Sequence, residues 1–442
     1  MTESLSIPPP HVSGTPAFRR ACAALFAAGL GTFMTLYCVQ ALLPSLASDL
    51  DLSPAGASLS VSVATLAMAV GVIPLTAVSD AWNRTSMMSL ALGAAAVFGI
   101  ASAFAPNFPV LLLLRLLQGL SLAGLQATAM SYLAEEVHPG SLGQAMGLYV
   151  AGNGIGGMLG RLAADGVLQW THSWRWSIGA VGVIAAVCAL VFRLAIPPSV
   201  RFVPKEATPR ALLRGVGRAL PDSGLLRLYL IGFMAMAAFV TVYNYLGFRL
   251  IDAPFNLSEG TAGLLFITYL SGSFSSALAG RLVDRCGRRL VLGPALAVAL
   301  VGLLLMLIPH LGGVIPGLVI FTVGFFAAHA VASGWVGARS SALGVQGAAV
   351  YLFFYYAGSA IGGSAGGSVY SHGHWGGLTV YTCVLVAIGL LSALSLWRLG
   401  GPSRGRVVSA TTAGGTAATS PAGPAAEAPP GAAGAGASTT GG

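Results

Sequence analysis

Charge is what this sequence has least of. Only 8% of its 442 residues are Asp, Glu, Lys or Arg, against about 25% in ordinary soluble domains. Hydrophobic residues make up 55% of the chain. A soluble domain of this composition would expose large apolar patches to water. The scarcity of charge therefore excludes an ordinary soluble protein and indicates a chain whose solvent is largely lipid.

Cysteine is also scarce, and the cysteines show no CxxC or metal-ligand spacing. They are Cys22, Cys38, Cys188, Cys286 and Cys383. The chain shows no nucleophile–base set and no nucleotide motif in a polar segment. We therefore expect no enzyme activity, no metal and no cofactor. No cleavable signal peptide is evident, because the apolar run from Ala21 is long enough to span a membrane.

Long apolar runs fill most of the chain instead. A spanning helix needs about 20 apolar residues, and twelve such runs are present, separated by Pro, Asn, Asp and His. The period-2 pattern of a barrel is absent, so the spans are expected to be helices. The predicted spans are about 21–46, 56–79, 86–105, 109–133, 142–165, 174–196, 225–250, 260–283, 289–309, 313–338, 344–369 and 376–398.

Basic residues predict the orientation of these spans. With the N-terminus inside, 18 of the 22 Arg and Lys residues fall in cytoplasmic segments. The net charge of +9 then needs no nucleic-acid partner. Within the basic segment at about 198–222, residues 210–218 are expected to form a short helix on the anionic membrane surface.

Two motifs occur twice along the chain. A glycine-rich stretch at 151–160 returns at 357–366, an offset of 206, and an Asp–Arg pair returns at an offset of 204, Asp80 with Arg84 and Asp284 with Arg288. Two unlike motifs at nearly one offset predict duplicated halves, an organisation typical of secondary transporters. The expected segments are a cytoplasmic segment 1–20, a six-helix half 21–197, a cytoplasmic linker 198–222, a second six-helix half 223–398 and a disordered cytoplasmic tail 399–442.

Residues 280–289, with Gly280, Asp284, Gly287, Arg288 and Arg289, resemble the cytoplasmic loop motif of the major facilitator superfamily. The copy at 76–85 keeps Asp80 and Arg84. Residues 115–119 match the intramembrane RxxQG motif of that family, and 151–160 resembles its antiporter motif, with Gly156-Gly157 where Gly-Pro is usual. Over about residues 20–400 the chain is most similar to the twelve-span drug:proton antiporters, including arabinose- and bicyclomycin-type efflux permeases.

The resemblance implies an all-α membrane fold of twelve helices in two pseudo-symmetric six-helix halves, functional as a monomer. It implies that the loop motifs hold the cytoplasmic side shut; the alternative is that their charges only set topology. The glycines of the repeated stretch form either a flexible contact between halves or ordinary tight packing. They are Gly152, Gly156, Gly157, Gly160, Gly358, Gly362 and Gly363.

Charged and polar residues inside the spans are the candidates for coupling and substrate binding. Arg115, Gln118 and Gln126 share one helix face, and serve either coupling or substrate; the alternative is a structural arginine bonded to backbone carbonyls. Arg161 and Asp165 are four apart and can pair, either as a coupling site or as a stabilising pair. His329 is either titratable or a packing residue.

Further polar side chains in spans form the predicted substrate cavity. They are Tyr37, Gln40, Asn153, Tyr243, Asn244, Tyr351 and Tyr355. Span 1 carries no acidic residue, which slightly favours a neutral or anionic substrate. The sequence thus predicts an inner-membrane transporter that exports a drug-like, sugar-like or metabolite molecule in exchange for protons. The alternative is uptake by proton symport, or facilitated diffusion.

Overall fold

Every regular element among the residues that the structure describes is a helix. The computed structural model describes residues 9–204, 209–343 and 347–397, without side chains for 209–213, and the predicted tail 399–442 lies outside these residues. The first part contains α1 (Pro16–Tyr37), a 3-10 helix η1 (Cys38–Leu42), α2 (Leu43–Asp49), α3 (Pro54–Ala81), α4 (Arg84–Ser102), α5 (Phe108–Glu136), α6 (Pro139–Thr171) and α7 (Trp174–Ala195).

The second part follows a short linker helix. It contains α8 (Pro209–Ala219), α9 (Ser223–Ile251), α10 (Glu259–Gly263), a 3-10 helix η2 (Leu264–Thr268), α11 (Tyr269–Cys286), α12 (Arg288–Leu305), α13 (Leu311–Leu343) and α14 (Gly347–Ser395). The helix predicted at 210–218 is thus present as α8.

The sequence marks where these helices begin. Side-chain oxygens of Thr15, Ser53, Asn107 and Asp222 accept hydrogen bonds from the first free backbone N–H groups of α1, α3, α5 and α9. Proline follows three of these caps, where it costs no helical hydrogen bond. Polar caps between apolar runs therefore fix the ends of the spans.

The described helices make twelve membrane crossings, as the sequence predicted. Ten helical segments are long and apolar enough to cross, and α1, η1 and α2 count there as one segment, as do α10, η2 and α11. The 33-residue α6 is a further crossing. The 49-residue α14 has a non-helical residue at His374 (φ 46°) and is two crossings merged, since about 74 Å of helix far exceeds one bilayer.

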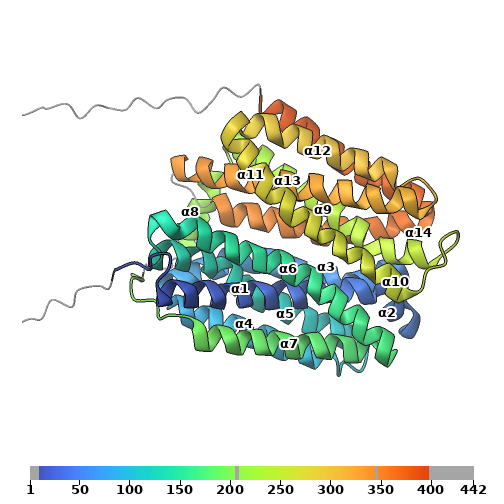
Figure 1. The fold of residues 1–442 in the computed structure, drawn as a ribbon, viewed down its shortest axis with the longest axis horizontal. Helices are drawn as coiled ribbons and strands as arrows, with labels where there is room; N and C mark the ends of the chain where they lie inside the picture. Colours follow the sequence, from blue (N-terminus) through green and yellow to red (C-terminus); the bar gives the residue numbers. More distant parts are fainter. Residues whose placement is uncertain (1–8, 205–208, 344–346, 398–442) are drawn as a thin grey trace, which may run out of the picture. The chain divides into compact units, whose positions relative to one another are not determined.

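The crossings pack in two groups. In the first, α1 packs against α6 and α7, and α5 packs against α3 and α4. In the second, α9 packs against α14, and α13 packs against α11 and α12. The groups meet where α3 contacts α14 and where α6 contacts α10, η2 and α11. Figure 1 shows the blue-to-green helices below and most of the yellow-to-red helices above.

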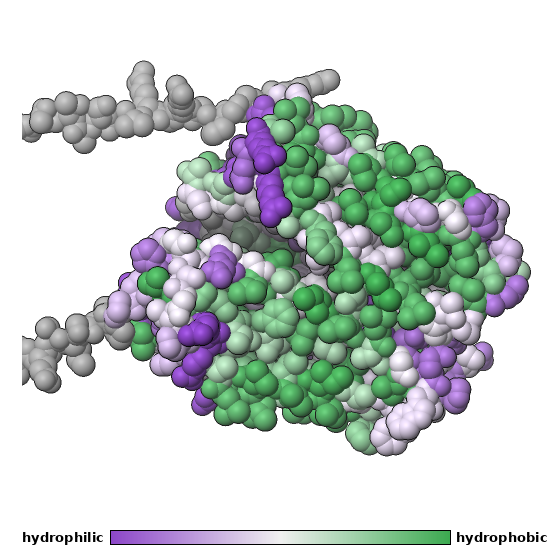
Figure 2. Space-filling view, viewed as in Figure 1, coloured by the Kyte–Doolittle hydropathy of each residue, from purple (hydrophilic) through white to green (hydrophobic). Residues whose placement is uncertain are grey.

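We call the end of the molecule that holds α8 and the start of α1 the linker end, and the end that holds α2 and α10 the far end (left and right in Figure 1). Figure 2 shows hydrophilic residues gathered at both ends and a broad apolar band between them. Exposed tryptophans lie near the band edges, with Trp170 and Trp176 at the far end and Trp82 and Trp397 at the linker end. This is the surface of a multi-pass membrane protein.

Candidate functional site

Two spans are interrupted deep in the molecule, and α6 contacts both interruptions. Span 1 changes from α1 to the 3-10 helix η1 directly after Tyr37, and span 8 changes from η2 to α11 at Tyr269. Both 3-10 segments contact α6. Interrupted spans are typical of transporter binding sites because they release backbone groups and redirect side chains.

Arg161 lies where the two interruptions meet. It is 22 residues beyond Pro139, about 33 Å along α6 from the linker end, and only 1% exposed. Its guanidinium donates to Gln40 Oε1 (2.8 Å from Nε), to the Tyr269 hydroxyl (2.8 Å) and to the carbonyl of Gly157. The Arg161 Cζ also lies 4.9 Å from the Tyr37 ring centroid and 4.4 Å from that of Tyr269.

Gln40 extends this network across the two groups of helices. Its amide oxygen accepts from Arg161, and its Nε2 donates to Asn244 Oδ1 on α9 (2.5 Å). Arg161 itself reaches Tyr269 on α11. We call Arg161, Gln40, Asn244 and Tyr269 the central network. It joins spans 1 and 5 to spans 7 and 8, and it brings together three of the predicted site residues.

The predicted ion pair between Arg161 and Asp165 is not formed, so that expectation was wrong. Arg161 turns its guanidinium toward Gln40 and Tyr269 instead, because η1 and α11 bring acceptors within reach. Asp165 is 6% exposed and its Oδ1 has no hydrogen-bond partner. It packs at the far end against Gly263 of α10, where an added Cβ would come within 3 Å of the carboxyl.

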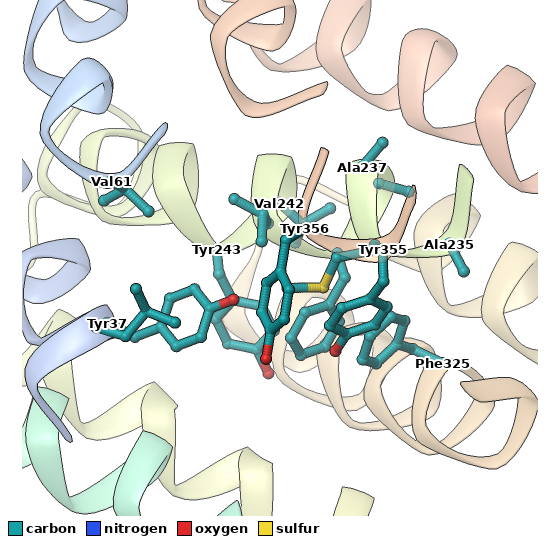
Figure 3. Packing of buried hydrophobic residues seen from close by; sticks show 14 of the residues in the cluster. Tyr37, Val61, Ala235, Ala237, Val242, Tyr243, Phe325, Tyr355 and Tyr356 are labelled. Carbon is teal, nitrogen blue, oxygen red and sulfur yellow. The ribbon is translucent and has the colours of Figure 1, made fainter. Parts of the chain in front are cut away.

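An aromatic wall continues from the central network. Phe239 of α9 stacks on Phe325 with ring centroids 3.8 Å apart, and it also contacts Tyr243 (4.8 Å) and Tyr269 (5.4 Å). Figure 3 shows Tyr37 of α1 opposite Tyr243 of α9, with further rings following; those labelled are Tyr355, Tyr356 and Phe325. Tyr37 and Tyr243 were predicted cavity residues, and both are buried.

The wall ends at His329, toward the linker end. The His329 Nδ1 is 2.9 Å from the Tyr351 hydroxyl, and its ring centroid is 4.5 Å from that of Tyr355. It also stacks on Phe325 (6.1 Å). The structure therefore brings the predicted His329, Tyr351 and Tyr355 together, as a separate cluster at the other end of the wall from Arg161.

Arg115 has the contacts of a brace between helices. It is 1% exposed and donates to the carbonyls of Ser60 (3.0 Å), Thr35 (2.8 Å) and Leu36 (2.5 Å) and to Gln118 Oε1 (2.5 Å). Thr35 and Leu36 end α1, where the change to η1 leaves carbonyls without helical partners. Arg115 thus stabilises the interruption that places Tyr37 and Gln40.

Two predicted residues lie apart from the central network. Gln126 on α5 is 9% exposed, and its Nε2 has no partner. Asn153 on α6 faces Gly29 of α1, and its Oδ1 has no partner. Neither side chain is among the hydrogen-bond partners of Arg161, Gln40 or Tyr269 in the described residues.

The first Asp–Arg motif forms a closed cluster at the linker end. Arg84 is 2% exposed and bonds Asp80 (2.9 Å), Glu135 (2.7 Å) and the Ser79 hydroxyl (2.8 Å). Its guanidinium also lies 4.9 Å from the Phe202 ring. Sequence analysis missed Glu135, although a Glu-Glu pair at the end of a span was a visible signal.

The second Asp–Arg motif is open. Asp284 and Arg288 are exposed, and no ion pair among the described residues joins them. Gly287 between them has φ 85°, a left-handed conformation that favours glycine and lets α11 turn sharply into α12. Gly280 is exposed on α11, and Arg289 is half-buried in the first turn of α12. The two copies of the motif therefore differ in this structure.

The repeated glycines pack each stretch onto a helix of its own group. A Cβ at Gly152, Gly156 or Gly160 would come within 3 Å of the α1 backbone, and at Gly358 or Gly362 within 3 Å of α9. Gly157 lies beside Arg161. Gly363 faces both Asn244 and Ser62 of α3, so it lies at a contact between the groups.

Contacts between the groups concentrate at the far end. Among described residues, the hydrogen bonds that cross are Gln40–Asn244, Arg161–Tyr269 and Tyr245–Ser58 (2.8 Å). A cavity of ≈ 20 Å³ remains beside Gln40 and Glu259, room for about one water. Figure 2 shows the surface hollowed at the linker end, on the left, between the groups. The described state is closed at the far end.

Sequence analysis did not single out Tyr269, Phe239 or Phe325. Each lies in an apolar span with no motif to mark it, and only packing brings it beside a predicted residue. The change to 3-10 geometry before Tyr269 has no proline to signal it.

Comparison with known proteins agrees with this architecture. The sequence model of the Major Facilitator Superfamily matches residues 25–254. The chain is 40% identical over 384 residues to the uncharacterised transporter YybF of Bacillus subtilis (strain 168), covering 86% of this chain and 95% of that protein. It is 40% identical over 397 residues to the inner membrane transport protein YnfM of Escherichia coli (strain K12), covering 90% and 95%.

A solved structure shows the same fold. A bacterial homologue of the human lysosomal transporter Spinster, in an inward-facing and occupied conformation, superposes with a TM-score of 0.69 at 17% identity, covering 87% of this chain and 97% of that chain. The predicted family and the predicted all-α fold are confirmed. The chain belongs to the Major Facilitator Superfamily.

Proposed function

We propose that this transporter exports a small, amphipathic, neutral or anionic molecule in exchange for protons. One observation supports the proposal most. Hydrogen bonds join the two groups of helices at the far end, and the surface between the groups is hollowed at the linker end. An alternating-access transporter requires two such states around a central site. Residues 21–197 and 223–398 are the proposed moving halves, and 198–222 is their linker.

The orientation follows from charge. We place both termini and the linker in the cytoplasm of a bacterial-type cell, because 18 of 22 basic residues then face inward. The described state is then inward-facing. Reporter labelling at Ser6, Ser199 and Ser420 tests this topology, and access to any of them from outside intact cells contradicts it.

Asp165 is the proposed proton carrier. It is buried at the closed far end, no ion pair among the described residues includes it, and it faces Gly263 of the other half. Opening the far end separates α6 from α10 and brings water to the carboxyl. A carboxyl that changes its surroundings between the two states can couple a proton to the motion. A second carboxyl in this region is that of Glu259 on α10, which lines the small cavity.

The Asp–Arg motifs are proposed as the cytoplasmic gate. In the inward-facing state the second copy is exposed and the first is paired with Glu135. Closing the linker end would bring the exposed Asp284 near the ends of neighbouring helices, where a carboxylate is stabilised by about 0.3–1 kcal/mol. That is enough to shift two states of nearly equal free energy.

Proteoliposomes test the proposal. Substrate-dependent proton release from vesicles with an imposed pH gradient, lost in Asp165→Asn, is the expected result. Symport or facilitated diffusion remains the second candidate, favoured by Gly156-Gly157 where the antiporter motif has Gly-Pro. Movement of substrate and protons in the same direction supports symport, and substrate movement without proton flux supports diffusion.

A further inference from the structure

We propose that Arg161 binds the carboxylate of an aromatic or similarly apolar organic acid, and that this acid opens the central network. The inference rests on the proposed transport function and names its substrate class. It follows from the charge of the site, its unused hydrogen-bond donors, and the wall that extends from it.

The site carries a buried positive charge that no carboxylate among the described residues contacts. All acceptors that Arg161 contacts are neutral: the Gln40 amide, the Tyr269 hydroxyl and the Gly157 carbonyl. No ion pair among the described residues includes Arg161, and Asp165 faces Gly263 instead. An unneutralised cation inside a membrane protein favours an anionic ligand strongly.

The unused hydrogen-bonding capacity around Arg161 includes donors. The Tyr37 hydroxyl is buried without a partner, and its ring lies under the guanidinium. Asn244, which accepts from Gln40 through Oδ1, also has a buried Nδ2 without a partner, on its side toward Gly363. A carboxylate has two oxygens that only accept, and a guanidinium binds both side by side. An ammonium ligand would find a positive charge here and would be repelled.

The aromatic wall is the surface against which an apolar body attached to that carboxylate would pack once the site opens. Starting beside Arg161, the rings of Tyr269, Tyr243, Phe239 and Phe325 follow one another at centroid distances of 3.8 to 5.4 Å. The wall leads to His329, closer to the hollowed linker end. A ligand with its carboxylate on Arg161 and its ring along this wall matches both ends of the site.

Binding there competes with the contacts that close the far end. A carboxylate on Arg161 takes the donors that now hold Gln40 and Tyr269. These contacts join spans 1 and 5 to spans 7 and 8, so their loss weakens the closed far end. The acid then binds the state that is open at the far end better than the state that is closed there. Such a difference in affinity is the condition for a ligand to shift the equilibrium between two states.

Matched acids and amides test the inference. The full-length protein in lipid nanodiscs is titrated calorimetrically with 3-phenylpropionate and indole-3-acetate, and with the amide of each. We expect each acid to bind at least about tenfold more tightly than its amide, the effect of hydrogen bonds to a charged group. Arg161→Gln should abolish this difference, and Arg161→Lys should retain part of it.

Two tyrosines provide a matched pair of variants that preserve the fold. The hydroxyls of Tyr37 and Tyr149 are both buried without a partner, but Tyr149 lies twelve residues before Arg161 on α6. Tyr37→Phe should weaken binding of the acids and leave the amides unchanged. Tyr149→Phe should change neither.

Several outcomes overturn the inference: no binding of either acid, equal binding of acid and amide, a difference that survives Arg161→Gln, or equal effects of the two tyrosine variants. If neutral compounds drive proton-linked transport and acids do not, the inference fails while the proposed function stands. If the acids bind as expected and nothing is transported, the carboxylate site stands and the proposed function fails.

Discussion

Replacing Arg115 with alanine should destabilise the protein by removing the brace at the interruption of span 1. The carbonyls of Thr35, Leu36 and Ser60 lose a buried donor. A buried acceptor left without a partner costs about 1–3 kcal/mol, so the three carbonyls together give at least about 3 kcal/mol. We expect Tm to fall by roughly 5 °C or more.

Arg115→Lys should fall between the wild type and Arg115→Ala, because one ammonium lacks the planar set of donors that reaches three carbonyls. Arg175→Ala is the matched control, since Arg175 is half-buried and donates a hydrogen bond to the Ala105 carbonyl. The measurement is thermal unfolding of purified protein in detergent, with membrane expression measured in parallel.

The bracing role predicts that loss of stability and loss of transport occur together in the Arg115 series. A wild-type Tm for Arg115→Ala would refute the reasoning. If that stable variant also failed to move substrate or protons, Arg115 would have a direct role in coupling.

Three further changes test other parts of the molecule. Asp284→Asn should lower transport at unchanged expression, measured in vesicles at equal protein; unchanged transport would argue against gating. Asp165→Asn should abolish proton flux while substrate exchange without a pH gradient persists; intact proton flux would remove Asp165 from coupling. The Arg339 guanidinium beside Asp222 holds the pKa of that carboxyl below its usual range, so its stabilisation is present above about pH 4 and is lost as pH falls further. Asp222→Asn keeps the α9 cap and should lose only the ion pair, whereas Asp222→Ala should lower the free energy of unfolding by about 1 kcal/mol more. Thermal unfolding at pH 7 and below pH 4 checks both effects. Equal Tm values for the two variants would contradict the capping role.

Much of the fold was predictable because lipid imposes it. Apolar runs of fixed length, polar caps and the repeated motifs indicate twelve helices, and the structure contains them. The break within α14 was predicted as well, between 369 and 376, where the sequence has two histidines and a glycine, and His374 adopts positive φ there.

The site was only partly predictable. Sequence spacing placed Asp165 within reach of Arg161, but spacing along one helix says nothing about acceptors on other helices. Gln40 and Tyr269 outcompete Asp165 because η1 and α11 bring them to the guanidinium. Similarly, the sequence marked Arg115 as unusual without showing that the end of α1 supplies its carbonyl partners.

Paired distance measurements test alternating access around the central network most directly. Spin labels on Pro106→Cys and His310→Cys report the far end, and labels on Gly143→Cys and Ser341→Cys report the linker end; all four positions are exposed. The exposed native Cys286 is replaced in both double-cysteine variants. Double electron–electron resonance is recorded in nanodiscs with and without 3-phenylpropionate, and in an Arg161→Gln background. We expect the acid to lengthen the far-end distance and shorten the linker-end distance in the same fraction of molecules, and Arg161→Gln to remove this response. Distances that stay fixed at both ends while the same protein transports substrate would contradict this expectation.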